Sequence, residues 1–137
     1  MPDPVPPMTV TLTWDSGLEF TGQAGKHEVG IDGTQQSAAS PMQMLALAMS
    51  GCMAIDVVHI IQRHHKTLTG LEARFTGERA QEDPKRFLRI HLQFVLNTDA
   101  TPEQVERAIQ LSRERYCSVW TSMRQDIELT VGYTIET

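Results

Sequence analysis

The chain has 137 residues, two cysteines and a formal net charge of −5 at pH 7. This length suits one domain with one core, and the acidic excess, without a basic stripe of interleaved aromatic residues, argues against nucleic acid as a partner. Two cysteines outside any CxxC pair exclude a disulfide-dense scaffold and disfavour structural zinc, so we expect neither a metal site nor a bound cofactor.

The amino-terminal third of the chain is predicted to be a short lead-in followed by strands. Residues 1–8 are rich in proline and are expected to be disordered, whereas residues 9–137 are expected to form a single domain. No basic start followed by an apolar run marks a signal peptide, so we expect a cytoplasmic protein. Alternating β-branched residues and intervening turn residues predict strands at Thr9–Trp14, Leu18–Thr21 and His27–Ile31.

A long helix is predicted next, and the rest of the chain is organised around it. Ser40 can cap this helix, Pro41 suits its first position, and Gln43 stands where a capping-box side chain belongs. Apolar residues fall on nearly every side from Met42 to Ile61, which predicts a helix buried all round. The uninterrupted apolar run ends at Asp56 and is too short to span a bilayer, so we expect no membrane association.

The carboxyl-terminal half is predicted to contain a hairpin, a helix and a last strand. The strand signal at Phe87–Leu96 is the strongest in the chain, with a core face formed by Leu88, Ile90, Leu92, Phe94 and Leu96. The other predicted elements are a strand at Leu71–Arg79, a helix capped by Thr101 that ends near Cys117, a short helix at Ser118–Met123 and a strand at Ile127–Ile135. This order lacks regular βαβ alternation and predicts an α+β fold.

The two cysteines stand in different surroundings. Cys52 lies within the predicted central helix, where helical spacing places Asp56 and His59 on the same face. Burial and a carboxylate both disfavour a thiolate there, so Cys52 is either a small core residue or a reactive group that needs a cation from elsewhere in the fold or from a partner chain.

Cys117 is the second candidate thiol. Arginines surround it in the sequence, which predicts a basic environment near the surface and favours its thiolate. Such a cysteine could resolve an oxidised partner. For Asp56 in the central helix we expect pairing with an arginine or lysine, or capping of a backbone group, rather than a role as a base.

These residues carry a family resemblance that covers Thr9 to Ile135. The chain resembles the OsmC/Ohr family, in particular its OsmC-like branch, in the runs SPMQMLALAMSGCMAIDVVHII, GERAQEDPKRFLRIHLQF and VERAIQLSRERYCSVW. The resemblance implies an OsmC-like α+β fold in two layers, with antiparallel sheets around a long buried central helix. It also implies an intertwined homodimer, which would cover that helix on all sides.

The resemblance further implies a thiol-dependent peroxidase that reduces organic hydroperoxides in oxidative-stress defence. Cys52 matches the cysteine that attacks the peroxide, and Cys117 matches the cysteine that resolves the product. An external dithiol of the lipoyl type is the implied reductant. The expected partners are therefore a second copy of the chain, an organic hydroperoxide or another small hydrophobic molecule, and a dithiol reductant.

The sequence departs from the peroxidase pattern at two places. Peroxidase members carry a glutamate directly after the proline that opens the central helix, and here Met42 and then Gln43 follow it. They also carry an arginine in the amino-terminal strands, and this chain has no arginine before residue 63. Asp56, Gln43 and Arg79 are the candidate supporting residues. The alternative function is a non-peroxidatic protein that binds a small hydrophobic ligand or electrophile in a pocket at the dimer interface.

Overall fold

The computed structural model of the protein describes residues 3–136. The chain divides into two compact units, residues 1–45 and residues 46–137, and each is described by itself. Residues 1, 2 and 137 lie outside the described residues. The first two belong to the predicted lead-in at 1–8, and the last belongs to the predicted single domain at 9–137.

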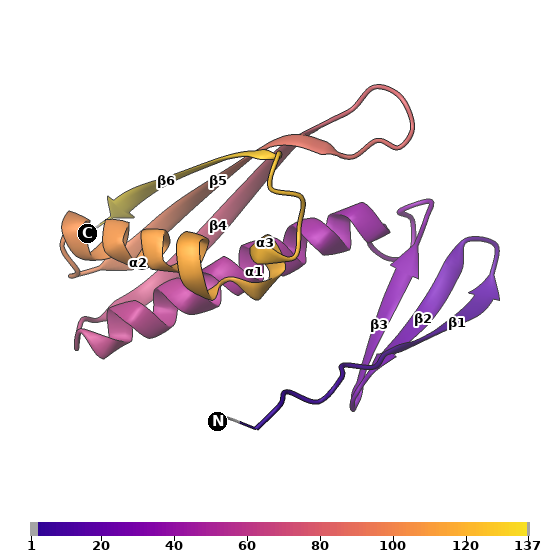
Figure 1. Cartoon of the computed structure of the whole chain (residues 1–137), viewed down its shortest axis with the longest axis horizontal. Coiled ribbons are helices and arrows are strands. Elements are labelled where there is room, and N and C mark those ends of the chain that lie inside the picture. Colours follow the sequence, from indigo (N-terminus) through magenta and orange to yellow (C-terminus); the bar gives the residue numbers. More distant parts are fainter. Residues whose placement is uncertain (1–2, 137) are drawn as a thin grey trace. The chain divides into compact units, whose positions relative to one another are not determined.

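The first unit contains a three-stranded antiparallel sheet in the order β1-β2-β3 (Figure 1). Its strands are β1 (Thr11–Ser16), β2 (Glu19–Ala24) and β3 (His27–Asp32). Gly17 and Gly25 form the two turns with φ values of +55° and +61°, in the left-handed region that favours glycine. The three predicted strands are confirmed, and β2 continues past its predicted end.

One face of this sheet is apolar and poorly covered. Cross-strand pairing places Trp14, Phe20 and Ile31 in one row. The neighbouring Leu12 shares the face of Trp14, because side chains two residues apart in a strand point to the same side. Leu12 is 55% exposed and Trp14 is 64% exposed. The described residues therefore leave a contiguous apolar surface on this sheet open.

A buried carboxylate organises the loop between β3 and the central helix. The side chain of Asp32 accepts hydrogen bonds from the backbone N–H groups of Thr34 (2.8 Å), Gln36 (3.2 Å) and Ser37 (3.0 Å). The backbone donors of Ser37 and Thr34, which stabilise the charged form, hold the pKa of Asp32 far below its usual range. The loop that leads to the helix is thus fixed from its first residue.

The central helix α1 (Pro41–Arg63) begins where the sequence predicts. The Ser40 backbone N–H donates to Oε1 of Gln43 at 2.9 Å, and the Gln43 backbone N–H donates to Oγ of Ser40 at 3.2 Å. This reciprocal pair is a capping box, which satisfies two backbone donors that helix geometry leaves free. The predicted cap is confirmed.

The prediction that α1 is buried on all sides is wrong for this chain alone. Its buried residues form one stripe, made of Met49, Ser50, Met53, Val57, Ile60 and Ile61. Leu47 is 65% exposed and Ile55 is 59% exposed. A single sheet can cover only one face of a helix, so the remaining apolar side chains of α1 lack cover among the described residues.

By length and composition, α1 is also apolar enough to cross a membrane, which corrects the expectation that its apolar run is too short. The uninterrupted run ends at Asp56, but the helix continues through further apolar residues to Arg63. The core helix of a soluble protein passes the same test.

The second unit contains a three-stranded sheet in the order β4-β5-β6 (Figure 1). Its strands are β4 (Leu68–Arg79), β5 (Phe87–Thr98) and β6 (Glu128–Glu136). The connection between the last two strands contains α2 (Pro102–Leu111), a π-helical turn (Ser112–Tyr116) and α3 (Ser118–Thr121). The predicted hairpin, helices and last strand are all present.

The expectation of purely antiparallel sheets is wrong, because β6 runs parallel to β5. The chain leaves β5 at one end of the sheet and returns through α2 and α3 to the other end, so β6 starts beside the start of β5. Parallel neighbours need such a crossover, usually a helical one. The second unit therefore contains one βαβ connection within an otherwise α+β arrangement.

The core face predicted for β5 is confirmed over most of its length. Ile90, Leu92, Phe94 and Leu96 are buried to 1% exposure or less. Leu88 is only half-buried, and Phe87 is buried in its place. The pairing of β4 with β5 shifts register between Glu78 and Arg79, and this irregularity lies opposite the start of β5.

Candidate functional site

Cys52 lies at the flank of the buried stripe of α1. Met49 and Met53, on either side of it in the helix, are fully buried, whereas Cys52 itself is half-buried. A residue next to Met53 in sequence is rotated by about 100° around the helix axis, which explains the intermediate exposure. The Cys52 thiol is therefore at the edge of the core rather than in its centre.

Cys117 lies at the start of α3 and is fully buried. It is the residue that caps this short helix, and its Sγ accepts a hydrogen bond from the backbone N–H of Trp120 at 3.3 Å. Its own backbone N–H donates to the carbonyl oxygen of Ser112 at 2.8 Å. These two contacts fix both the backbone and the thiol of Cys117.

The fold brings the two cysteines together as free thiols. The pKa of the Cys117 thiol is raised from 9.0 to about 11, mainly by burial and to a smaller extent by the neighbouring Cys52 side chain and the Asp56 carboxylate. The Trp120 N–H opposes these effects because it stabilises the thiolate. Cys117 is thus a protonated thiol at neutral pH in the reduced chain.

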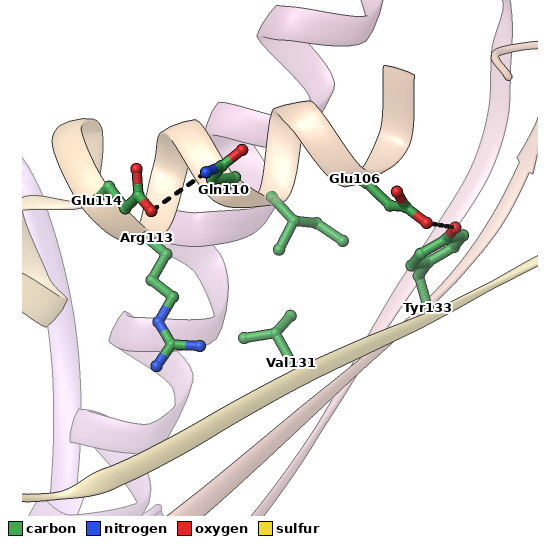
Figure 2. A pocket seen from close by; sticks show the side chains of 7 residues that line it. Glu106, Gln110, Arg113, Glu114, Val131 and Tyr133 are labelled. Carbon is green, nitrogen blue, oxygen red and sulfur yellow. Dashed lines mark hydrogen bonds between the residues drawn. The ribbon is translucent and has the colours of Figure 1, made fainter. Parts of the chain in front are cut away.

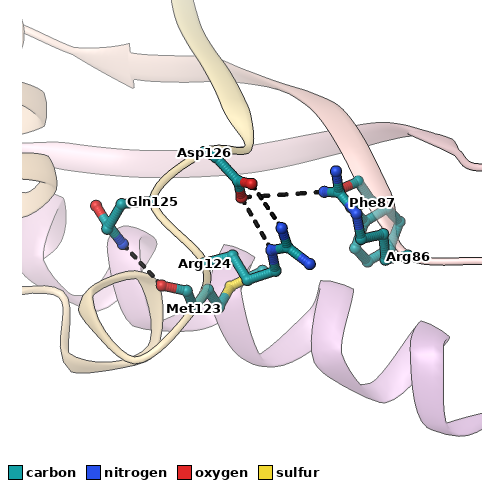
Figure 3. A network of polar contacts seen from close by, with 6 residues as sticks. All are labelled: Arg86, Phe87, Met123, Arg124, Gln125 and Asp126. Carbon is teal, nitrogen blue, oxygen red and sulfur yellow. Dashed lines mark hydrogen bonds and ion pairs between the residues drawn. The ribbon is translucent and has the colours of Figure 1, made fainter. Parts of the chain in front are cut away.

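The prediction that Cys117 is near the surface in basic surroundings is therefore wrong. Figure 2 shows the Arg113 side chain extending toward Val131, into a pocket of about 300 Å³ between α2 and β6. Figure 3 shows Arg124 paired with Asp126, with nitrogen to oxygen distances of 2.6 Å and 2.9 Å. Sequence proximity to arginines does not place their charges at the thiol.

Asp56 connects the central helix to the turn before Cys117. Its Oδ2 accepts a hydrogen bond from Oγ of Ser112 at 2.7 Å, and Ser112 is fully buried. The expected partner was an arginine, a lysine or a backbone group, so this prediction is wrong. A hydroxyl stabilises the carboxylate by a hydrogen bond without neutralising its charge, which leaves a negative charge beside the cysteine pair.

The turn that Ser112 begins is π-helical, a form that appears mostly as short bulges and frequently at functional sites. Nothing in the sequence distinguished Ser112 from other serines, because its importance depends on a contact with Asp56, far away in the chain. The sequence contains a weak signal for the contact with Trp120. This residue stands three positions after Cys117, and a helix-capping side chain commonly accepts a hydrogen bond from the backbone N–H at that spacing.

The contacts of the remaining predicted residues involve groups other than the two cysteines. Gln43 closes the capping box of α1 and lies in the first unit. His59 is exposed. Arg79, at the end of β4, donates from Nε to the carbonyl oxygen of Lys85 at 2.8 Å and fastens the loop between β4 and β5. Their roles stay predictions.

Among residues 3–136, no group of three or more histidine, cysteine, aspartate or glutamate side chains is arranged to hold a metal ion. The groups found at the cysteine pair are two thiols, the Asp56 carboxylate and the Ser112 hydroxyl. Two adjacent thiols can form a disulfide when one of them is oxidised.

Known proteins resemble this chain in sequence and in fold. A family model described as OsmC-like protein matches residues 33–132. Protein YhfA of Escherichia coli K12 is 37% identical, over 93% of this chain and 98% of its own length. A hypothetical protein from Aquifex aeolicus has a similar structure with a TM-score of 0.89, 22% identity and coverage of 96% and 98% of the two chains.

An organic hydroperoxide resistance protein from Elizabethkingia anophelis also has a similar structure. Its TM-score is 0.72 and its identity is 16%, with 97% of this chain and 99% of that chain covered. At this identity the likeness concerns the fold alone.

Proposed function

Because this chain belongs to the OsmC-like protein family, we propose that it is a thiol-dependent peroxidase that reduces organic hydroperoxides. In this proposal Cys52 attacks the peroxide and Cys117 resolves the oxidised product. Structures similar to this chain include proteins named for organic hydroperoxide resistance, which supports the proposal of a role in oxidative-stress defence.

The observation that carries the proposal is the meeting of Cys52 and Cys117 as free thiols from two distant elements. A structural disulfide is absent from this pair, and packing alone does not require two thiols next to each other. The half-buried position of Cys52 leaves one of the two sulfurs open to a small molecule, whereas Cys117 is fully enclosed. This asymmetry suits an attacking and a resolving cysteine.

The proposed reaction balances with one hydroperoxide and one dithiol. The Cys52 thiolate attacks the terminal peroxide oxygen, the O–O bond breaks and an alcohol leaves, so that Cys52 becomes a sulfenic acid. Cys117 then displaces the sulfenic oxygen as water and forms a disulfide with Cys52. An external dithiol, of the lipoyl type in our proposal, reduces this disulfide by thiol exchange.

We further propose that a second copy of the chain completes the site. Trp14 on the first sheet and Leu47 and Ile55 on α1 are exposed apolar side chains, and monomeric proteins rarely leave such surfaces open together. Among the described residues, each arginine side chain that donates a hydrogen bond donates it to a group other than Cys52. A partner chain, with Arg79 as the candidate, is our proposed source of the cation.

The second candidate function is binding without peroxidase chemistry. It is favoured by the protonated state of Cys117 and by the lack, among the described residues, of an arginine side chain that donates a hydrogen bond to Cys52. In that case the apolar surface beside Cys52 would hold a small hydrophobic ligand or electrophile. For either function we propose a cytoplasmic location, as the family is one of soluble proteins.

The proposal predicts that cumene hydroperoxide oxidises both thiols of the reduced protein. We expect the free-thiol count to fall from two to zero, with an intact mass lower by two hydrogen atoms, because an intramolecular disulfide forms. The measurements are thiol titration and intact-mass spectrometry after addition of one equivalent of peroxide. A lipoyl dithiol is expected to restore both thiols.

Two variants make the assignment specific. Cys52→Ser should keep its single thiol under the same treatment, and Cys117→Ser should accumulate a sulfenic acid, detected by a dimedone adduct. Survival of both thiols of the unsubstituted protein in excess peroxide would refute the peroxidase and leave the binding function as the better description.

A further inference from the structure

Asp56, which is half-buried, and Ser112, which is fully buried, link the helix that carries Cys52 to the turn that precedes Cys117. The hydroxyl of Ser112 donates to Oδ2 of Asp56 at 2.7 Å, and the carbonyl oxygen of the same serine accepts the backbone N–H of Cys117 at 2.8 Å. Ser112 thus contacts both the carboxylate of Asp56 and the backbone of Cys117. The carboxylate lies one helical turn after Cys52 on the same face of α1.

Disulfide formation requires the Cys117 thiol to lose its proton inside the core. The thiol is fully buried, so solvent cannot remove that proton directly. The titratable side chains that act on this thiol among the described residues are Cys52 and Asp56, both from α1. Once Cys52 is a sulfenic acid, it is the group under attack, and Asp56 is the remaining proton acceptor.

The geometry leaves one oxygen of Asp56 available for this task. Oδ2 is engaged by Ser112, whereas no described residue donates a hydrogen bond to Oδ1. The arginines near Cys117 in sequence are directed elsewhere. Arg113 extends into the pocket between α2 and β6, Arg115 lies over the Tyr116 ring, and Arg124 pairs with Asp126. None of them neutralises the carboxylate.

We propose that Asp56 accepts the Cys117 proton during disulfide formation, and that Ser112 positions the carboxylate for this transfer; this inference rests on the proposed function. The Cys117 S–H bond breaks as its sulfur attacks the sulfur of the Cys52 sulfenic acid, and the S–O bond of the sulfenic acid breaks. The proton passes through Asp56 to the departing hydroxide, which leaves as water. Cys117 is oxidised, the sulfenic sulfur is reduced, and the carboxylate is restored.

The test is the rate of disulfide formation in Asp56→Asn, a variant that still accepts the Ser112 hydrogen bond but cannot take up a proton. Cys52 is first converted to a mixed disulfide with an aromatic disulfide reagent, and attack by Cys117 then releases a coloured thiol. We expect Asp56→Asn to slow this release by about 100-fold at pH 7, within the range of general-base catalysis. The rate should recover as the pH rises toward the pKa of the thiol.

Matched variants separate this role from a structural one. Asp126→Asn makes the same change at an exposed carboxylate paired with Arg124 and should leave the rate unchanged. Ser112→Ala should slow release by about 10-fold without recovery at high pH, because positioning rather than the base is lost. Circular dichroism and thermal unfolding check that each variant folds. Hydrogen exchange at the Cys117 amide, compared between each variant and the unsubstituted protein, checks that the turn is intact.

An unchanged or faster release in folded Asp56→Asn would overturn the inference, because a carboxylate that only repels the thiolate slows the attack. This assay needs no peroxide. If peroxide fails to oxidise Cys52, the proposed function falls, while the release rate still decides the role of Asp56.

Discussion

The side chains around Cys117 show how burial competes with charge at the scale of single residues. An exposed charge at 4 Å from another contributes about 1 kcal/mol in water, and the arginines near Cys117 in the sequence are exposed. Enclosing a thiolate removes its solvation, and each pKa unit corresponds to about 1.4 kcal/mol. Burial therefore dominates, and the pKa of Cys117 rises instead of falling.

This shift predicts a pH dependence of stability on the alkaline side. The folded-state pKa of Cys117 is about 11 against 9.0 for an unperturbed thiol, so the folded chain holds the proton more tightly. The contribution to stability is complete below pH 9 and is lost as the pH rises from 9 to 11. Urea unfolding of the reduced protein at several pH values measures it.

Cys117→Ala provides the control for this prediction. Its stability should decline less than that of the unsubstituted protein over the same pH interval, because the thiol that changes its protonation is gone. An equal decline in both proteins would show that other groups are responsible.

At the scale of elements, the second sheet is held together by the apolar face of β5. Leu92 pairs with Phe75 of β4 on one side and with Val131 of β6 on the other, and it is fully buried. The helical connection between β5 and β6 covers the same unit and delivers Cys117 near α1. The core face and the cysteine pair therefore depend on one crossover.

Leu92→Ala tests the importance of this face. We expect the free energy of unfolding to fall by about 2–5 kcal/mol, because the change removes buried methyl groups and leaves a cavity in the centre of the sheet. Val95→Ala, on the half-buried opposite face, should lower it by about 1 kcal/mol or less. Urea denaturation of both variants measures the difference, and equal losses would contradict the assignment of the core face.

At the scale of the whole molecule, the main question is what covers the apolar surfaces that each unit leaves open. The first sheet exposes Leu12 and Trp14, and α1 exposes Leu47 and Ile55. Burying apolar surface is worth about 25 cal/mol per Å², so side chains of this size would contribute substantially to association. A second copy of the chain is the partner that we propose.

Ile55→Asp tests that proposal. In a monomer this exposed position should tolerate the change within about 0.5 kcal/mol, whereas at an interface it buries an unpaired charge and favours dissociation. We expect twice the chain mass for the unsubstituted protein and the chain mass for the variant in sedimentation equilibrium. Gln62→Asp, exposed on the same helix, should keep the mass of the unsubstituted protein.

A monomeric mass for the unsubstituted protein at micromolar concentration would contradict the homodimer. A dimer that persists unchanged in Ile55→Asp would place the interface elsewhere on the molecule.

Local patterns in the sequence determined much of this structure. The capping residues Ser40 and Thr101, the alternation over Phe87–Leu96 and the turn residues around Gly17 each act over a few neighbouring positions, and the corresponding elements are found. Two cysteines in recognisable contexts also indicated the family, which the comparisons confirm.

Three features depended on the tertiary structure alone. These are the parallel pairing of β6 with β5, the burial of Cys117, and the hydrogen bond between Ser112 and Asp56. Each arises where segments distant in sequence meet, and sequence spacing says nothing about the solvation or the partners that a side chain finds there. Local propensity shapes the elements, but burial and long-range contacts set the chemistry of the thiols.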